Sequence, residues 1–122
     1  MIGTALLVDD EELVRMSTAD MLSDLGYKVV EAASAEEALR LLNGGLRADL
    51  IVTDHLMPGM NGTDLARSVR LQRPNIQVLL ISGYSETEGI APDLPRLSKP
   101  FRNADLAASL AALRQGNRSF AE

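Results

Sequence analysis

The sequence predicts an α/β fold: one doubly wound, flavodoxin-like sheet of five parallel strands, a (βα)₅ arrangement with strand order 2-1-3-4-5. Short β-branched or aliphatic runs alternate with longer stretches in which apolar residues recur every three or four positions. The length of 122 residues suits five such units in one domain, and no internal repeat interrupts them. This alternation implies right-handed crossovers, which place helices on both faces of a parallel sheet.

Five short apolar runs are the predicted strands, and the helices lie between and after them. In chain order the strands are Ala5–Val8, Lys28–Glu31, Leu50–Thr53, Ile76–Ile81 and Pro95–Leu97. Helical periodicity covers Val14–Leu25, Ala35–Leu42, Leu65–Val69 and Leu106–Leu113. A further helix near Ser85–Ala91 is expected to be short or mobile, because Gly89 lies inside it and Pro92 follows.

Residues that favour helix ends support these boundaries. Ser34 followed by Glu37 has the pattern of a capping box at the start of the second helix. Glycine is common just after a helix, where the backbone adopts a left-handed conformation, and we expect Gly26, Gly44 and Gly116 to take that position.

The composition fits one domain whose core must suffice without disulfides, since 46% of the residues are hydrophobic and cysteine is absent. We expect residues 1–116 to form this domain and residues 117–122 to be a tail or a cut end.

A net charge of −5 disfavours nucleic-acid binding. No apolar run approaches the ~20 residues of a membrane span. We therefore expect a soluble, cytoplasmic protein that binds neither nucleic acid nor membrane.

Polar side chains follow four of the five predicted strands. The first strand runs into Asp9 and Asp10, the third into Asp54, the fourth into Ser82 and the fifth into Lys99. Ligands of open α/β sheets bind at the carboxyl ends of the strands, where the strand order reverses. In the order 2-1-3-4-5 the first and third strands are neighbours at that point, so the three aspartates come together.

Three carboxylates and one ammonium group would leave this edge of the sheet negatively charged, which is costly unless a dication lies among them. The chain has no cysteine and one histidine, so Mg²⁺ or Mn²⁺ is favoured over Zn²⁺. Lys99 and the Ser82 hydroxyl would then face the remaining oxygens of a phosphoryl group.

Four motifs at these strand ends resemble those of the receiver domains of two-component response regulators, of the chemotaxis-regulator kind. They are Leu6–Asp10, Ile51–Asp54 continued by Met57–Gly62, Ile81–Gly83, and Ser98–Phe101. They span nearly the whole chain in the expected order. One alone is weakly specific, but four with strands and helices between them are highly specific.

The resemblance implies a signalling module rather than a turnover enzyme. Asp54 would be the phosphoacceptor, taking a phosphoryl group from a histidine kinase or a histidine phosphotransfer protein. Asp10 would bind Mg²⁺ directly, Asp9 mostly through water, and the Leu56 carbonyl would be a further ligand. The domain would catalyse only its own phosphorylation and dephosphorylation, and phosphorylation would switch partner binding.

The resemblance also implies roles for the last two strand ends. Ser82 and Lys99 would bind phosphoryl oxygens, and the peptide bond between Lys99 and Pro100 would be cis. Many receivers carry an aromatic switch residue three positions before the lysine, where this chain has Arg96. We expect Arg96 to stay at the surface, and a downstream partner to bind the surface formed by the helix near Ser85–Ala91, the fourth in chain order, and the fifth strand.

Other interpretations remain open at this point. Asp9 and Asp10 could cap the first helix, and His55 most resembles a variable, partly exposed family position. A phosphohydrolase with an aspartyl-phosphate intermediate has a similar site, but in one large family of these the general acid stands where this chain has Leu56. A docking module that is not phosphorylated would be favoured only if an acidic ligand or Lys99 were missing.

Overall fold

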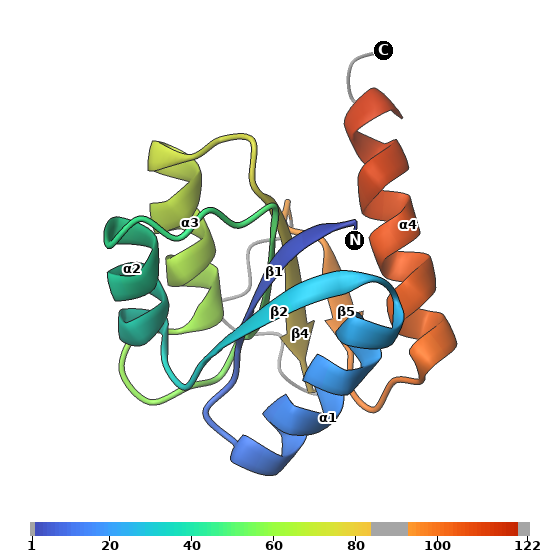
Figure 1. Ribbon diagram of the computed structural model, residues 1–122, viewed down its shortest axis with the longest axis horizontal. Coiled ribbons are helices and arrows are strands. Elements are labelled where there is room, and N and C mark those ends of the chain that lie inside the picture. Colours follow the sequence, from blue (N-terminus) through green and yellow to red (C-terminus); the bar gives the residue numbers. More distant parts are fainter. Residues whose placement is uncertain (1, 84–92, 120–122) are drawn as a thin grey trace.

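A computed structural model describes residues 2–83 and 93–119 of the chain. Its five parallel strands form one sheet in the order β2-β1-β3-β4-β5, as the sequence predicts (Figure 1). They are β1 (Gly3–Val8), β2 (Tyr27–Ala32), β3 (Leu50–Asp54), β4 (Gln77–Ser82) and β5 (Arg96–Ser98). Each strand begins and ends within two residues of its predicted bounds.

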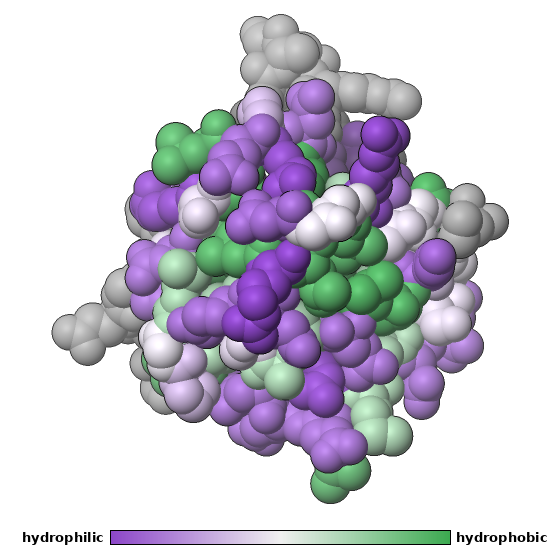
Figure 2. All heavy atoms as spheres, turned by 60° about the vertical axis from the view of Figure 1, so that its left-hand side comes forward, coloured by the Kyte–Doolittle hydropathy of each residue, from purple (hydrophilic) through white to green (hydrophobic). Residues whose placement is uncertain are grey.

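Helices cover both faces of this sheet. They are α1 (Glu12–Asp24), α2 (Ala35–Asn43), α3 (Gly62–Gln72) and α4 (Asn103–Ser119). Strand β1 shows how the layers divide, since Leu6 and Val8 pack on the side of α2 and α3, whereas Ala5 and Leu7 pack on the side of α1 and α4. Figure 2 brings α2 and α3 forward and shows hydrophilic side chains around a group of apolar ones.

Two further expectations from the sequence concern the predicted fourth helix and membrane-spanning segments. The helix expected near Ser85–Ala91 lies outside the described residues. Among the helices that the structure describes, none has the length and apolar character needed to cross a bilayer.

The helix ends confirm part of the prediction and correct the rest. The Ser34 hydroxyl accepts a 3.0 Å hydrogen bond from the Glu37 N–H, as a capping box requires. Gly26 has a φ of +104°, but Gly44 has −82°, and the left-handed residue after α2 is Gly45. The expectation for Gly44 is therefore wrong by one residue. The expectation for Gly116 is also wrong, because α4 continues through it to Ser119.

The strand register brings the polar strand ends to one edge of the sheet. Asp54 pairs with Ile81, and Ser82, the next residue, pairs with Ser98. Asp9 follows the last residue of β1, and Lys99 follows the last residue of β5. Because all the strands are parallel, these side chains share the carboxyl edge.

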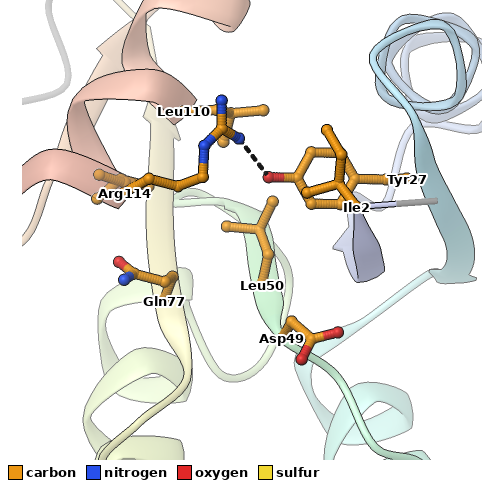
Figure 3. Close-up of a pocket in the computed structure, with 8 residues that line it drawn as sticks. Ile2, Tyr27, Asp49, Leu50, Gln77, Leu110 and Arg114 are labelled. Carbon is orange, nitrogen blue, oxygen red and sulfur yellow. Dashed lines mark hydrogen bonds between the residues drawn. The ribbon is translucent and has the colours of Figure 1, made fainter.

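The opposite, amino edge carries a small cavity of about 160 Å³ between α4 and the first residues of β2, β3 and β4 (Figure 3). Leu50, Leu110 and Leu113 contribute apolar walls. Arg114 Nη1 donates a 3.1 Å hydrogen bond to the Tyr27 hydroxyl across it. This cavity lies at the far end of the sheet from the polar strand ends.

Candidate phosphorylation and metal site

Three aspartates meet at the carboxyl edge of the sheet. Asp9, Asp10 and Asp54 each offer a carboxylate oxygen, and these oxygens lie within 4.8 Å of one another. Asp9 and Asp54 are each 5% exposed, whereas Asp10 is exposed to solvent. The structure therefore brings together the three aspartates that the sequence singled out.

Lys99 reaches this cluster from the end of β5. Its Nζ lies 2.7 Å from Asp54 Oδ1, which makes a direct ion pair with a nearly buried carboxylate. The Lys99 backbone N–H also donates a 2.8 Å hydrogen bond to the Ser82 carbonyl, which fixes the residue after β5 to the end of β4. The bond between Lys99 and Pro100 is cis, as the resemblance implies.

Ser82 presents a buried hydroxyl at the end of β4. The residue is fully buried, and its Oγ has no hydrogen-bond partner among residues 2–83 and 93–119. A buried hydroxyl without a partner costs free energy. An incoming phosphoryl oxygen would supply the missing partner.

Asp9 is fixed by backbone contacts at the start of α1. Its carboxylate accepts a 2.9 Å hydrogen bond from the Glu11 N–H, and its carbonyl accepts a 2.8 Å bond from Arg15 Nη1. Burial raises the pKa of Asp9, although the Glu11 hydrogen bond and the positive charge of Lys99 partly oppose this rise. The N-cap of α1 is Glu11, and its own side chain makes no capping hydrogen bond. The Asp9 carboxylate accepts from one N–H at this helix end, but capping gives no reason for three aspartates to meet.

The loop after Asp54 approaches the site closely. Gly62 opens α3, and a Cβ there would clash with the Asp54 carbonyl oxygen, so only glycine fits. Leu56 is 56% exposed beside the cluster, and its carbonyl stays a predicted ligand. His55 is 1% exposed, with Nδ1 3.0 Å from the Thr63 hydroxyl. The expectation of a partly exposed His55 is therefore wrong, because Thr63 at the start of α3 packs against the imidazole over the end of β3.

Two further residues support the site, and the sequence analysis did not find them. Arg15 donates a hydrogen bond to the Asp9 carbonyl. It is the single basic residue in the otherwise acidic segment 9–24, and this feature of the sequence could have pointed to it. Glu36 Oε2 accepts a 3.0 Å hydrogen bond from the Met60 N–H, and this bond lowers the pKa of Glu36. Glu36 thus ties the loop after Asp54 to α2, a contact for which the sequence gives no local pattern.

The donor set fits a small, hard cation. Carboxylate oxygens are preferred ligands of Mg²⁺, whose metal–oxygen distances of about 2.1 Å place opposite ligands about 4 Å apart. The oxygens of Asp9, Asp10 and Asp54 lie within 4.8 Å of one another, so small side-chain adjustments bring them to that spacing. The site could therefore hold a metal ion.

The fold and this site define a class: a small α/β domain with a cluster of three aspartates and a lysine at the carboxyl edge of its sheet, a charge pattern suited to a phosphoryl group and a dication. The family model described as the response regulator receiver domain matches residues 5–111. The chain belongs to the response regulator receiver domain family, whose members serve as phosphoacceptors in two-component signalling.

Relatives and solved structures agree with this assignment. The sensor kinase CckA of Brucella abortus is 40% identical over 115 residues, which are 88% of this chain and 12% of that protein. The chain thus spans about an eighth of the length of that relative. The crystal structure of a response regulator receiver protein from Sinorhizobium medicae has a TM-score of 0.81 and 33% identity, covering 90% of this chain and 92% of that one. The receiver domain of the hybrid histidine kinase CckA has a TM-score of 0.76 and 33% identity, covering 91% and 98%.

Charge repulsion within the cluster leads to a stability prediction. In EDTA, Asp54→Asn should raise the melting temperature by about 3–5 °C, because about 1 kcal/mol of repulsion among crowded carboxylates is relieved. The variant should also show a smaller stabilisation by Mg²⁺ than the wild type. Thermal melts with and without Mg²⁺ measure both effects, with Asp20→Asn on the exposed side of α1 as the control. An unchanged melting temperature in EDTA would count against a strained cluster.

Proposed function

We propose that Asp54 is the residue that accepts the phosphoryl group, and that the reaction depends on Mg²⁺ or Mn²⁺. The main support is a nearly buried carboxylate that lies 2.7 Å from Lys99 and beside two further aspartates. Asp9, Asp10, Asp54 and the Leu56 carbonyl would hold the cation. When bound, it supplies positive charge that offsets the charge on the phosphoryl oxygens.

The chemistry is a single displacement at phosphorus. An Asp54 carboxylate oxygen forms a bond to phosphorus while the phosphorus–nitrogen bond of a donor phosphohistidine breaks, and the electron pair leaves with the imidazole nitrogen. Lys99 would move from the Asp54 carboxylate to a phosphoryl oxygen, and the Ser82 hydroxyl would donate to another. The product is an acyl phosphate on Asp54.

This function makes the chain a phosphoacceptor that acts on itself and not an enzyme for other substrates. A phosphohydrolase is not favoured, because the exposed apolar side chain of Leu56 cannot serve as a general acid. A docking module that is not phosphorylated is not favoured either, since the acidic residues and Lys99 are all in place.

The partner that supplies the phosphoryl group would be a histidine kinase or a histidine phosphotransfer protein. A groove of about 400 Å³ beside the site supports this proposal, because its lining includes Leu13, Val14 and Phe101 together with Lys99, the partner of Asp54. An apolar helix that carries the phosphohistidine would fit along it. Docking there would bring the donor next to Asp54.

The second proposed partner is the downstream protein that would recognise the phosphorylated domain. A downstream partner would bind the surface that includes β5, where Arg96 is exposed, as expected from the sequence. We propose no contact of this domain with nucleic acid or membrane, and a cytoplasmic location. The acidic net charge of −5 supports the absence of nucleic-acid binding.

Phosphorylation by a small donor tests the proposal directly. Incubation with acetyl phosphate and Mg²⁺ should add the mass of one phosphoryl group to the wild-type chain, measured as intact mass. Asp54→Ala should show no addition, and EDTA should suppress it in the wild type. Asp93→Ala is the control, because Asp93 is an exposed aspartate that pairs with α3, away from the cluster. Full phosphorylation of Asp54→Ala, or of the wild type in EDTA, would refute the assignment.

A further inference from the structure

We propose that Arg15 is a positioning residue for the metal-binding aspartates, and that Glu31 holds it in place. This inference rests on the proposed function of the same site. Arg15 does not reach a metal ion or a phosphoryl group by itself. It acts through the backbone between Asp9 and Asp10.

The contacts of Arg15 are short and point in two directions. Its Nη1 donates to the Asp9 carbonyl at 2.8 Å, and its Nε lies 3.1 Å from Glu31 Oε1. The Arg15 side chain is 16% exposed, so it is held between α1 and the sheet rather than extended into solvent. Because the guanidinium is planar, two bonds from different nitrogens fix its orientation.

The bond to the Asp9 carbonyl matters because that oxygen belongs to the peptide unit joining Asp9 to Asp10. Holding this peptide plane sets the direction in which the Asp10 side chain leaves the backbone. Asp10 depends on such support, since it is exposed and its carboxylate makes no hydrogen bond or ion pair with the described residues. The Asp9 carboxylate, in contrast, is also held by the Glu11 N–H.

Glu31 completes the arrangement from β2. Strand β2 contributes no carboxylate to the acidic cluster, yet Arg15 connects the two. Glu31 also offsets the charge of the guanidinium, so that Arg15 can support the site without cancelling its attraction for a cation.

A positioning role and simple electrostatics predict opposite changes in the affinity for Mg²⁺ when Arg15 is removed. Removing a positive charge near three carboxylates should strengthen Mg²⁺ binding if electrostatics alone were at work. If Arg15 positions the ligands, its removal should weaken binding, as is usual when a residue that orients metal ligands is lost. The sign of the change in affinity therefore decides between them.

Mg²⁺ binding measured by calorimetry on the full chain, without any phosphodonor, is the test. Arg15→Ala should raise the Kd for Mg²⁺ about tenfold. Glu31→Gln should raise it by a smaller factor, because the arginine keeps its bond to the Asp9 carbonyl. Arg73→Ala is the matched control, since Arg73 also donates a 2.8 Å bond to a carbonyl, that of Leu42, far from the site. Arg73→Ala should lower stability but leave the Kd unchanged.

An unchanged or lower Kd in Arg15→Ala would overturn the inference, as would an equal rise in Arg73→Ala. If Arg15→Ala does not fold, Arg15→Lys takes its place. It should raise the Kd for Mg²⁺ by less than tenfold, because lysine keeps the charge but cannot make both bonds. No rise in the Kd of Arg15→Lys would again overturn the inference. A wild-type chain that binds Mg²⁺ but takes no phosphoryl group would refute the proposed function, and the Kd comparison would still decide the role of Arg15. No Mg²⁺ binding by the wild type would overturn both.

Discussion

Gly62→Ala should destabilise the domain by about 3 kcal/mol or more, the upper range for overpacking in a close-packed interior. The added Cβ would clash with the Asp54 carbonyl oxygen and lie 3.0 Å from Leu80 Cδ1. Neither neighbour can retreat easily, since one is backbone and the other lies in the core. The gain in helix propensity from glycine to alanine, about 1 kcal/mol, is too small to offset this clash. Denaturant unfolding measures the loss.

Gly44→Ala is the control for this prediction. Gly44 also has a negative φ, and a Cβ there would come no closer than 3.1 Å, to the Arg40 carbonyl. Its stability should change by about 1 kcal/mol or less. If Gly62→Ala were as mild as Gly44→Ala, that result would contradict the close approach of α3 to the Asp54 carbonyl at the end of β3.

Lys99→Ala should slow phosphorylation of Asp54 about tenfold to a hundredfold. Loss of one charged group that stabilises a transition state commonly costs a hundredfold or more, and the 29% exposure of Lys99 reduces the effect through solvent screening. The variant should also melt at a lower temperature in EDTA, because the Asp54 carboxylate stays buried without the ammonium group of Lys99 beside it.

The rate of acyl-phosphate formation from acetyl phosphate, followed by intact mass, checks this prediction. Lys28, exposed on β2, is the other lysine of the chain, so Lys28→Ala is the natural control and should react at the wild-type rate. Equal rates for Lys99→Ala and the wild type would show that the ion pair with Asp54 has no part in the reaction.

The sheet and the main site residues were predictable because both depend on local pattern and on a general property of parallel sheets. Alternating apolar runs located all five strands to within two residues. Once the order of the strands is known, their carboxyl ends must meet, and this brings Asp54 next to Asp9 and Asp10 without any knowledge of side-chain packing.

The errors and omissions concern contacts between segments that are distant in sequence. Burial of His55 depends on Thr63 and α3 packing over the end of β3, which no local pattern reveals. The role proposed for Arg15 depends on its contact with Glu31, 16 residues away on β2. The shift from Gly44 to Gly45 reflects two adjacent glycines that satisfy the same rule, so that the local sequence cannot choose between them.

The central claim is that one carboxylate, that of Asp54, carries the phosphoryl group, and chemical trapping of this group tests it most directly. Borohydride reduces an acyl phosphate to an alcohol and would turn a phosphorylated aspartate into homoserine, which peptide mass spectrometry can locate. After treatment with acetyl phosphate and Mg²⁺, we expect homoserine at position 54 alone, and none when the phosphodonor is left out. Homoserine at position 9 or 10, or no reduced residue in a chain that has gained the phosphoryl mass, would contradict the account.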